Sequence, residues 1–274
     1  GTFNLQNKKI LVDAANGANY KITPMLLREL GADVTLVNCN PDGFNINENC
    51  AVLDNQLFDD YITKYDVDFC VAVDGDGDRL ILSDGNGRVM SGDDILYVLA
   101  ARNKLMRKES SEIVVGTEMT NQGAINALKK LDIDCIRTKV GDKYVSRELV
   151  KKDLNLGSEP SGHIIQREFS ESGDANIALI QTLSALSELD LAVEDVHSKI
   201  EYKPQSLKNF YVDDFTFIES EDFCTNLEKL KTDFPDARIS IRKSGTQQII
   251  RAMVEAETDD DKKAIFVKIE SFIK

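Results

Sequence analysis

Hydrophobic and polar positions in the first third of the chain follow two alternating patterns. Apolar runs of strand length occur in KKILVDAANG, DVTLVNC and VDFCVAV, and the amphipathic stretches TPMLLRELGA and LDNQLFDDYITKY lie between them. Strands that alternate with helices are typical of α/β domains, in which helices cover the faces of a sheet. The pattern therefore predicts an α/β domain over residues 1–90.

The same order of elements begins again about a hundred residues later. EIVVGTEMTNQGA predicts a strand and a turn, INALKKL a helix, DIDCIRTKV a second strand and DKYVSRELVKK another helix. The turns also correspond, since Asn16-Gly17-Ala18 is matched by Gln122-Gly123-Ala124. We infer a second α/β domain over residues 91–199, closed by a helix from about Asp174 to Leu189 and the segment LAVEDVHSKI.

The pattern changes after residue 199. EYKPQSLKNFYV leads to a helix over EDFCTNLEKLKTDF, strands around ARISIRK and QIIRAMVEAE, and a last helix over DDDKKAIFVKIESFI. This order favours a small α+β domain with an antiparallel sheet over residues 200–274. The fold class that we predict is α/β, with two tandem mixed-sheet α/β domains followed by this α+β domain.

Composition narrows the classes of protein that remain. The chain has 274 residues, 42% of them hydrophobic, and no apolar run approaches the roughly 20 residues that span a bilayer. A net charge of −14 disfavours nucleic acid as a partner, because binding to phosphate backbones needs basic surfaces. Five cysteines without a C-x-x-C pair suit reduced thiols in a cytoplasm, and with two histidines they make a zinc site improbable. The beginning, GTFNLQNKKI, has neither an initiator Met nor a signal pattern, and we expect a piece of a longer polypeptide.

Three aspartates stand close together in VAVDGDGDRL. Asp74, Asp76 and Asp78 follow the apolar run 69–73, which places them at the carboxyl end of a strand, and Arg79 comes directly after them. Their mutual repulsion costs free energy unless a cation lies between them, and hard oxygen ligands suit Mg²⁺ or Ca²⁺. The spacing fails as an EF-hand, because that loop needs Gly and Glu where this chain has Arg79 and Gly85. The alternative is an acidic turn without a ligand.

Two further loops carry polar side chains suited to a small ligand. LGSEPSGHII projects Glu159, Ser161 and His163, which can bind vicinal hydroxyls and exchange a proton, although a solvated turn is equally consistent with the local sequence. TKVGDKYVSREL places Lys139 and Lys143 around a Gly-Asp turn, in which Asp142 could simply cap a helix.

A local basic cluster occurs near the end of this acidic chain. In RKSGTQQIIRAMVE, Arg242, Lys243 and Arg251 flank the tripeptide Ser244-Gly245-Thr246, and together they could surround one phosphate. The spacing of a P-loop is absent. The alternative is a hairpin with basic ends.

These motifs occur in one order that resembles a known family. DGDGDR, the form G-x-E-x-S-G-H at residues 157–163, and R-x-S-G-T are similar to the motifs of the α-D-phosphohexomutases, and the similarity runs from about Lys8 to the C-terminus. Within the family, ILVDAANGANYKITPMLLRELGADV, PDGFNIN and TKVGDKYV most resemble bacterial members that act on glucosamine phosphates. The family has four domains, and the resemblance implies that this chain holds the second, third and fourth. The first domain, with the phosphorylated serine of a Ser-His-Asn-Pro loop, would be a partner on the same polypeptide.

The resemblance also implies a role for each motif. Mg²⁺ would be held by Asp74, Asp76 and Asp78, with an oxygen of the phosphoserine as its remaining ligand and Arg79 beside it. The sugar hydroxyls would be bound by Glu159 and Ser161, and His163 and Lys143 would either transfer a proton or contact phosphate. The non-reacting phosphate of the substrate would be anchored by Arg242, Ser244, Gly245, Thr246 and Arg251.

The reaction implied is an intramolecular phosphotransfer. Glucosamine 6-phosphate and glucosamine 1-phosphate would interconvert through the phosphoserine and a glucosamine 1,6-bisphosphate-type intermediate, which would supply amino-sugar nucleotides and cell-wall precursors. No S-H-N-P occurs in these residues, so we expect this chain alone to be inactive. The alternatives are mannose or glucose phosphate as substrate, or a non-catalytic module that binds sugar phosphate.

Three positions depart from the family pattern. Thr246 is followed by Gln247-Gln248 instead of Glu-Pro, Ser158 stands where Gly is common, and Ala175 stands where Gly is more usual. The first of these departures replaces a proline that would stiffen the turn, and we expect it to affect the affinity for phosphate.

Overall fold

The first sheet follows the alternation of strands and helices in the sequence. In the computed structural model, which describes residues 3–108, 111–212, 214–244 and 248–273, this sheet has the strand order β2-β1-β3-β4-β5. β1 is parallel to β2 and β3, and β4 and β5 are antiparallel to their neighbours, so the sheet is mixed. Its strands are β1 (Lys9–Asp13), β2 (Asp33–Val37), β3 (Phe69–Val73), β4 (Leu80–Asp84) and β5 (Val89–Met90).

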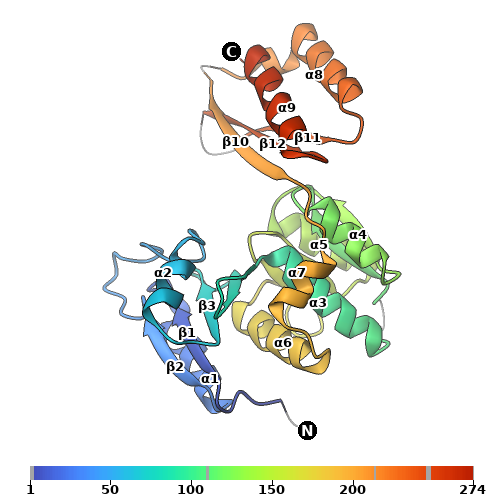
Figure 1. Ribbon diagram of the computed structural model, residues 1–274. Helices are drawn as coiled ribbons and strands as arrows, with labels where there is room; N and C mark the ends of the chain where they lie inside the picture. The colour runs from blue at the N-terminus through green and yellow to red at the C-terminus, as the bar shows by residue number, and fades with distance from the viewer. Residues whose placement is uncertain (1–2, 109–110, 213, 245–247, 274) are drawn as a thin grey trace. The chain divides into compact units, whose positions relative to one another are not determined.

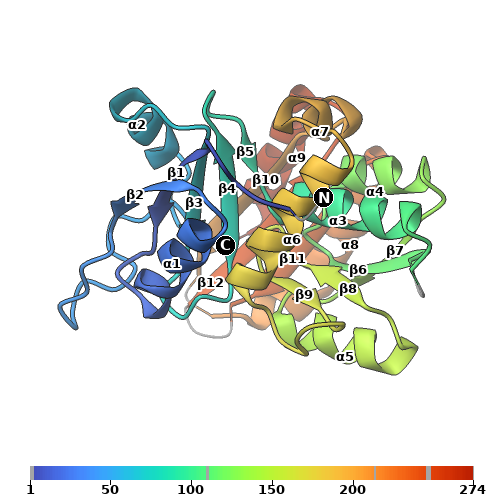
Figure 2. The ribbon, with the colours of Figure 1, turned by 90° about the horizontal axis from the view of Figure 1, so that it is seen from below.

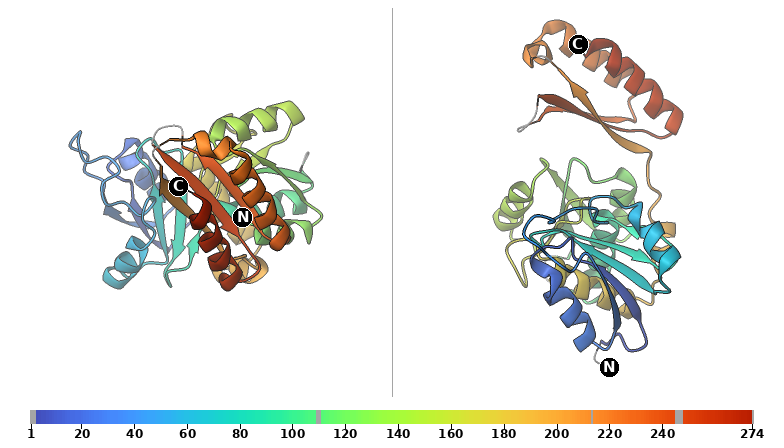
Figure 3. Two further views of the ribbon diagram at one scale, coloured as in Figure 1. Left: turned by 90° about the horizontal axis from the view of Figure 1, so that it is seen from above. Right: turned by 90° about the vertical axis from the view of Figure 1, so that its left-hand side faces the viewer.

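Different helices cover the two faces of this sheet (Figures 2 and 3). Successive residues of a strand point to opposite faces. Leu11 therefore packs with Phe58 of α2 on one face, and Val12 packs with Leu27 of α1 on the other. The helices of this part are η1 (Ala18–Tyr20), α1 (Ile22–Glu29) and α2 (Leu57–Lys64).

The second sheet repeats the topology of the first. Its order, β7-β6-β8-β9, has the same parallel and antiparallel relations as β2-β1-β3-β4, which supports the inference of two related domains. Its strands are β6 (Ile113–Thr117), β7 (Asp134–Thr138), β8 (Leu156–Ser158) and β9 (Ile164–Gln166). The helices around it are α3 (Gly92–Leu105), α4 (Gln122–Lys129), α5 (Asp142–Lys152), α6 (Ala175–Glu188) and α7 (Val193–Lys199).

One hydrophobic core joins these two sheets. It contains Val73 of the first sheet, Val114 of the second, and Leu96 and Leu179 of α3 and α6. The opposite face of the second sheet is covered by α5, whose Leu149 packs with Val115 and Ile165. Residues up to 120 and 124–201 consequently form one compact unit. The boundary predicted at residue 90 falls between β5 and α3 and stays a prediction.

The second unit contains residues 121–123 and the chain from residue 202 onward. Its antiparallel sheet has the order β10-β12-β11, and both α8 and α9 cover one face of it (Figure 1), where Leu230 packs with Val254 and Phe266. The predicted fold class is confirmed. The elements are β10 (Gln205–Tyr211), η2 (Thr216–Glu219), α8 (Glu221–Asp233), β11 (Arg238–Lys243), β12 (Ile249–Glu255) and α9 (Asp259–Phe272).

The three helices of 14 residues, α3, α6 and α9, each begin at a side-chain cap. Ser91, Asp174 and Thr258 accept hydrogen bonds from backbone N–H groups of the first turn, which would otherwise lack partners. Throughout the described part of the chain, no helix has the length and apolar surface needed to cross a membrane.

Candidate functional site

The three aspartates lie together at the end of β3. One carboxylate oxygen from each of Asp74, Asp76 and Asp78 lies within 4.8 Å of the others. Asp74 is fully buried, Asp78 is partly buried and Asp76 is exposed. Carboxylate oxygens at this spacing fit a hard divalent cation such as Mg²⁺, because ligands on one ion that are each about 2.1 Å from it lie about 3–4 Å apart.

The backbone of this metal loop (residues 74–79) folds around the first carboxylate. Oδ1 of Asp74 accepts hydrogen bonds from the N–H groups of Asp78 at 3.1 Å and Arg79 at 3.0 Å. The turn passes through Gly77, whose φ of 79° is unfavourable for residues with a Cβ. The alternation of Asp and Gly thus lets the loop bring its acidic side chains to one point.

Two basic side chains meet the aspartates. Nε of Arg79 lies 2.6 Å from Oδ2 of Asp74, and Nδ1 of His163 lies 3.1 Å from Oδ2 of Asp78. Burial raises the pKa of Asp74, but the hydrogen bonds and charge of Arg79 outweigh it, and the pKa of this carboxyl lies below its ordinary value. Burial and the adjacent Asp74 charge raise the pKa of Asp78. The carboxylates therefore perturb one another as expected for a site that takes a cation.

The loop between β8 and β9 is joined to the start of β4. The N–H of Leu80 donates to the carbonyl of Gly162 at 3.0 Å, and Arg79 pairs with His163 in a β-bridge. Gly162 has a φ of 92°, and a Cβ there would lie 2.2 Å from the Leu80 carbonyl oxygen. This close approach requires glycine, and it brings His163 from the second sheet to Asp78 of the first.

The other predicted residues of unit 1 differ in exposure. Glu159 is buried, and its Oε2 accepts a hydrogen bond from the N–H of Gly141 at 3.0 Å, whereas Ser161 is exposed. Lys143 is exposed at the start of α5, with Nζ over the ring of Tyr144. Glu159 thus connects its loop to the turn that precedes Lys143. Gly141 is the N-cap of α5, so the alternative that Asp142 caps this helix is wrong.

The basic cluster of the second unit lies on neighbouring strands. Arg242 of β11 and Arg251 of β12 are cross-strand partners, which puts both guanidinium groups on the same face of the sheet. Within the described part of the chain, the buried Nε of Arg251 has no hydrogen-bond partner. Ser244 follows β11 and donates its N–H to the carbonyl of Ile249. Lys243 forms an ion pair with Glu219 at 3.0 Å.

Two residues of the predicted phosphate loop, Gly245 and Thr246, lie outside the described residues, as does Gln247. The described members of this loop nevertheless place two cations side by side, and like charges at directly opposite positions of a sheet are destabilising unless an anion compensates them. This arrangement suits phosphate binding.

Family models cover these three parts of the chain. Domain II of phosphoglucomutase/phosphomannomutase matches residues 2–87, domain III matches residues 91–202 and the C-terminal domain matches residues 208–271. The chain belongs to the α-D-phosphohexomutase family.

Three curated relatives of this phosphohexomutase chain share one name. Phosphoglucosamine mutases of Photorhabdus laumondii, Staphylococcus haemolyticus and Yersinia enterocolitica are 39%, 36% and 40% identical over 100%, 94% and 94% of this chain. The matches cover 63%, 58% and 59% of those proteins, so the chain spans about three-fifths of their length.

Solved structures share the fold of this phosphohexomutase chain. An N-acetylglucosamine-phosphate mutase in its substrate complex has a TM-score of 0.77 at 20% identity, covering 99% of this chain and 62% of that one. N-acetylphosphoglucosamine mutase of Aspergillus fumigatus, in complex with GlcNAc-6P and magnesium, has a TM-score of 0.74 at 20% identity, covering 97% and 66%.

One contact of the site could not be predicted from the sequence of this phosphohexomutase chain. Gly173 lies directly against the ring of His163, where a Cβ would be 2.5 Å from Cε1. In the sequence, the segment Gly173-Asp174-Ala175 departs from the family pattern only at Ala175. A glycine shortly before a helix cap indicates a close approach of some kind, but the sequence does not say which side chain it contacts.

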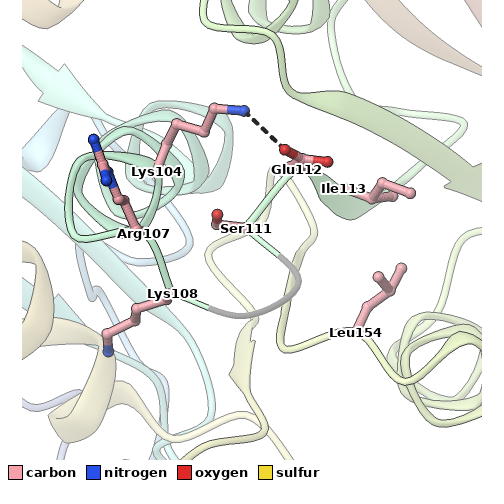
Figure 4. A pocket seen from close by; sticks show the side chains of 7 residues that line it. All are labelled: Lys104, Arg107, Lys108, Ser111, Glu112, Ile113 and Leu154. Carbon is pink, nitrogen blue, oxygen red and sulfur yellow. Dashed lines mark hydrogen bonds and ion pairs between the residues drawn. The ribbon is translucent and has the colours of Figure 1, made fainter.

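None of the described candidate residues lines the open hollow beside α3 of this phosphohexomutase chain. This hollow, of about 450 Å³, is drawn in Figure 4. One of its basic side chains, Lys104, is paired with Glu112 at 3.5 Å, as the dashed line shows. We therefore assign it no part in the site. Its lining residues are Lys104, Arg107, Lys108, Ser111, Glu112, Ile113 and Leu154.

Proposed function

We propose that this chain carries the metal, sugar and phosphate sites of a phosphoglucosamine mutase, which interconverts glucosamine 6-phosphate and glucosamine 1-phosphate. The observation that carries the proposal is the meeting of the three aspartates with Arg79 and His163, from two different sheets, at one place. The relatives named phosphoglucosamine mutase support this substrate over mannose or glucose phosphate.

The three aspartates would hold Mg²⁺. Their donor set consists of oxygens only, and the ligand atoms are close enough to share one ion after small adjustments. When bound, the ion supplies positive charge that stabilises the oxygens of a phosphoryl group during transfer. Arg79 would add a fixed cation beside the same oxygens, because its guanidinium is already held by Asp74.

Glu159 and Ser161 would hydrogen-bond the hydroxyls of the sugar. His163, whose Nδ1 faces Asp78, would either move a proton or contact phosphate. Lys143 is the second candidate for these two roles. Both residues are consistent with the chemistry of a phosphoryl transfer.

The second unit would anchor the phosphate that does not react. Arg242 and Arg251 can each form charge-assisted hydrogen bonds to its oxygens, and Ser244 can add its hydroxyl. Gly245 and Thr246 would complete the loop with backbone N–H groups and a second hydroxyl. A fixed clamp of this kind suits a reaction in which both phosphate positions of the sugar exchange roles.

The phosphoryl donor would be a phosphoserine that is not among these 274 residues. In the proposed reaction, the P–O bond to the serine breaks as the free sugar hydroxyl forms its own P–O bond, which gives a bisphosphate. The bisphosphate then returns its other phosphoryl group to the serine oxygen. In each transfer, a base takes the proton of the attacking hydroxyl. The oxygen that loses the phosphoryl group leaves as an alkoxide and takes up a proton.

The test is an activity assay on the protein expressed from its complete reading frame. We expect turnover of glucosamine 6-phosphate to exceed that of mannose 6-phosphate and glucose 6-phosphate. Asp78→Asn should lower kcat by about 100-fold or more, whereas the control Asp66→Asn, which changes an exposed aspartate of the same domain, should keep the parent rate.

Two results would overturn the proposal. Preference for mannose or glucose phosphate would refute the substrate, and full activity of Asp78→Asn would refute the role of the metal loop. The 274-residue chain by itself should show no turnover, because it lacks the S-H-N-P serine. Activity of this chain above a mock preparation would contradict the assignment of a phosphoserine donor.

A further inference from the structure

Two loops that resemble the family, and to which no role is assigned above, contact the metal loop. They belong to the segments VDAANGAN and PDGFNIN. The N–H of Ala18 donates to the carbonyl of Gly75 at 2.7 Å, and Oδ1 of Asn47 accepts from the N–H of Gly75 at 2.8 Å. Both backbone polar groups of Gly75 are therefore held by other parts of the chain.

Steric contacts hold the same glycine from two sides. A Cβ on Gly17 would lie 2.3 Å from the carbonyl oxygen of Gly75, and a Cβ on Gly75 would lie 2.6 Å from Cγ1 of Ile46. Gly75 stands between Asp74 and Asp76, so its position determines where the backbone presents these two carboxylates. The two loops thus form a cradle for the metal loop, made by residues 17–18 and 46–47.

Asn47 is itself fixed in place. Its φ is 61°, a left-handed conformation that asparagine tolerates better than most residues, and its N–H donates to the carbonyl of Ala15 at 2.8 Å. Ala15 lies shortly after β1, next to β3 in the sheet. The backbone of Asn47 is therefore held by the end of β1, and its side chain accepts a hydrogen bond from the metal loop, which keeps three negative charges together.

We propose that Asn47 is a positioning residue for the divalent cation, acting through the N–H of Gly75. The inference rests on the proposed metal role of the three aspartates. Groups that orient metal ligands without touching the ion are worth about 10- to 100-fold in affinity when they are removed. Without an acceptor, the peptide between Asp74 and Gly75 can rotate, and the carboxylates lose the geometry that a small ion such as Mg²⁺ requires.

The experiment compares three variants of the 274-residue chain by titration calorimetry with Mg²⁺ alone. Asn47→Gly removes the acceptor but keeps a residue suited to positive φ, and we expect its dissociation constant to rise about tenfold or more. Asn47→Asp keeps an acceptor oxygen and should bind Mg²⁺ at least as tightly as the parent. The matched control is Asn49→Gly, on an exposed asparagine of the same segment with a φ of 48°, which should bind as the parent does.

Folding is checked by thermal unfolding of each variant without Mg²⁺. If Asn47→Gly does not fold, the variant Ala18→Pro replaces it, because proline removes the N–H that donates to the carbonyl of Gly75. Ala18 is the first residue of a 3-10 helix and the preceding Gly17 has an extended backbone, so this position accepts proline. We expect it to weaken Mg²⁺ binding too.

The outcomes separate this inference from the proposed function. Mg²⁺ binding to the parent, with an unchanged dissociation constant in folded Asn47→Gly, would overturn the positioning role and leave the metal site standing. Equal weakening in Asn47→Gly and Asn49→Gly would also overturn it, since the effect would then belong to the segment as a whole. Absence of Mg²⁺ binding to the parent would overturn the metal site itself, and this inference with it.

Discussion

Replacement of Arg251 by methionine should stabilise the second unit in phosphate-free buffer and destabilise it relative to the parent when phosphate is added. Arg251 faces Arg242 across β11 and β12, and its Nε is buried without a hydrogen-bond partner among the described residues. Methionine keeps an unbranched apolar stem in the same place but removes the charge and the unsatisfied donor.

The magnitudes follow from the two effects. Like charges directly opposite each other in a sheet cost about 0.2–1 kcal/mol, and an unsatisfied buried donor adds to this cost, so we expect a gain of about 1 kcal/mol for Arg251→Met without phosphate. Phosphate at ten times its dissociation constant stabilises a protein that binds it by about 1.4 kcal/mol. The parent should show this increase and the variant should not, so the order of stability reverses.

The assay is urea unfolding followed by hydrogen exchange of the β12 amides, which reports on the second unit alone. Arg238→Met is the matched control, because Arg238 lies on the same sheet but is paired at 2.9 Å with Glu255, which is 3% exposed. Its loss removes the ion-pair partner of this buried carboxylate, which keeps one hydrogen bond from the N–H of Gln122, and should cost about 2 kcal/mol with or without phosphate. An Arg251→Met variant that is less stable than the parent without phosphate, and is stabilised equally by it, would refute the reasoning.

Three further predictions concern the first unit and the thiols. Gly162→Ala should lower the free energy of unfolding by at least about 2 kcal/mol in a urea titration, because of its positive φ and the contact with the Leu80 carbonyl; a variant as stable as the parent contradicts this contact. Ser158→Ala should raise the free energy of unfolding by about 1 kcal/mol, because the buried Oγ has no hydrogen-bond partner in the described part of the chain. A less stable variant would contradict an unsatisfied hydroxyl. Exposed Cys224 should react with a thiol reagent at pH 8, whereas Cys70, whose pKa burial raises to about 12, should react only on unfolding; rapid labelling of Cys70 in the folded chain excludes its burial.

Local features of the fold were predictable from the sequence because they depend on neighbouring residues. The apolar run 69–73 and the acids after it predict a strand that ends in a cluster of carboxylates, and the structure has β3 ending at Val73 with Asp74 next. The last helix, predicted over residues 259–273, is α9 (Asp259–Phe272). In both cases, periodicity and a change of residue type determine the element within a few positions.

Contacts between distant segments were not predictable in the same way. Asn47 and Gly75 are 28 residues apart, and the sequence contains several other asparagines next to glycine-rich turns. The glycines at 17, 162 and 173 indicate that something approaches the backbone closely, but each one meets a different segment. The start of α5 shows that local prediction can also fail. Asp142 is a favourable capping residue, but the N-cap is Gly141, which also donates its N–H to Glu159.

The claim on which the account depends is that the three aspartates of the metal loop bind one divalent cation. Anomalous diffraction from crystals of this chain soaked in Mn²⁺ tests it directly, since Mn²⁺ accepts the same oxygen ligands as Mg²⁺. The account predicts one peak about 2.2 Å from an oxygen of each of Asp74, Asp76 and Asp78. A loop without a peak, with Mn²⁺ bound elsewhere on the chain, would contradict it.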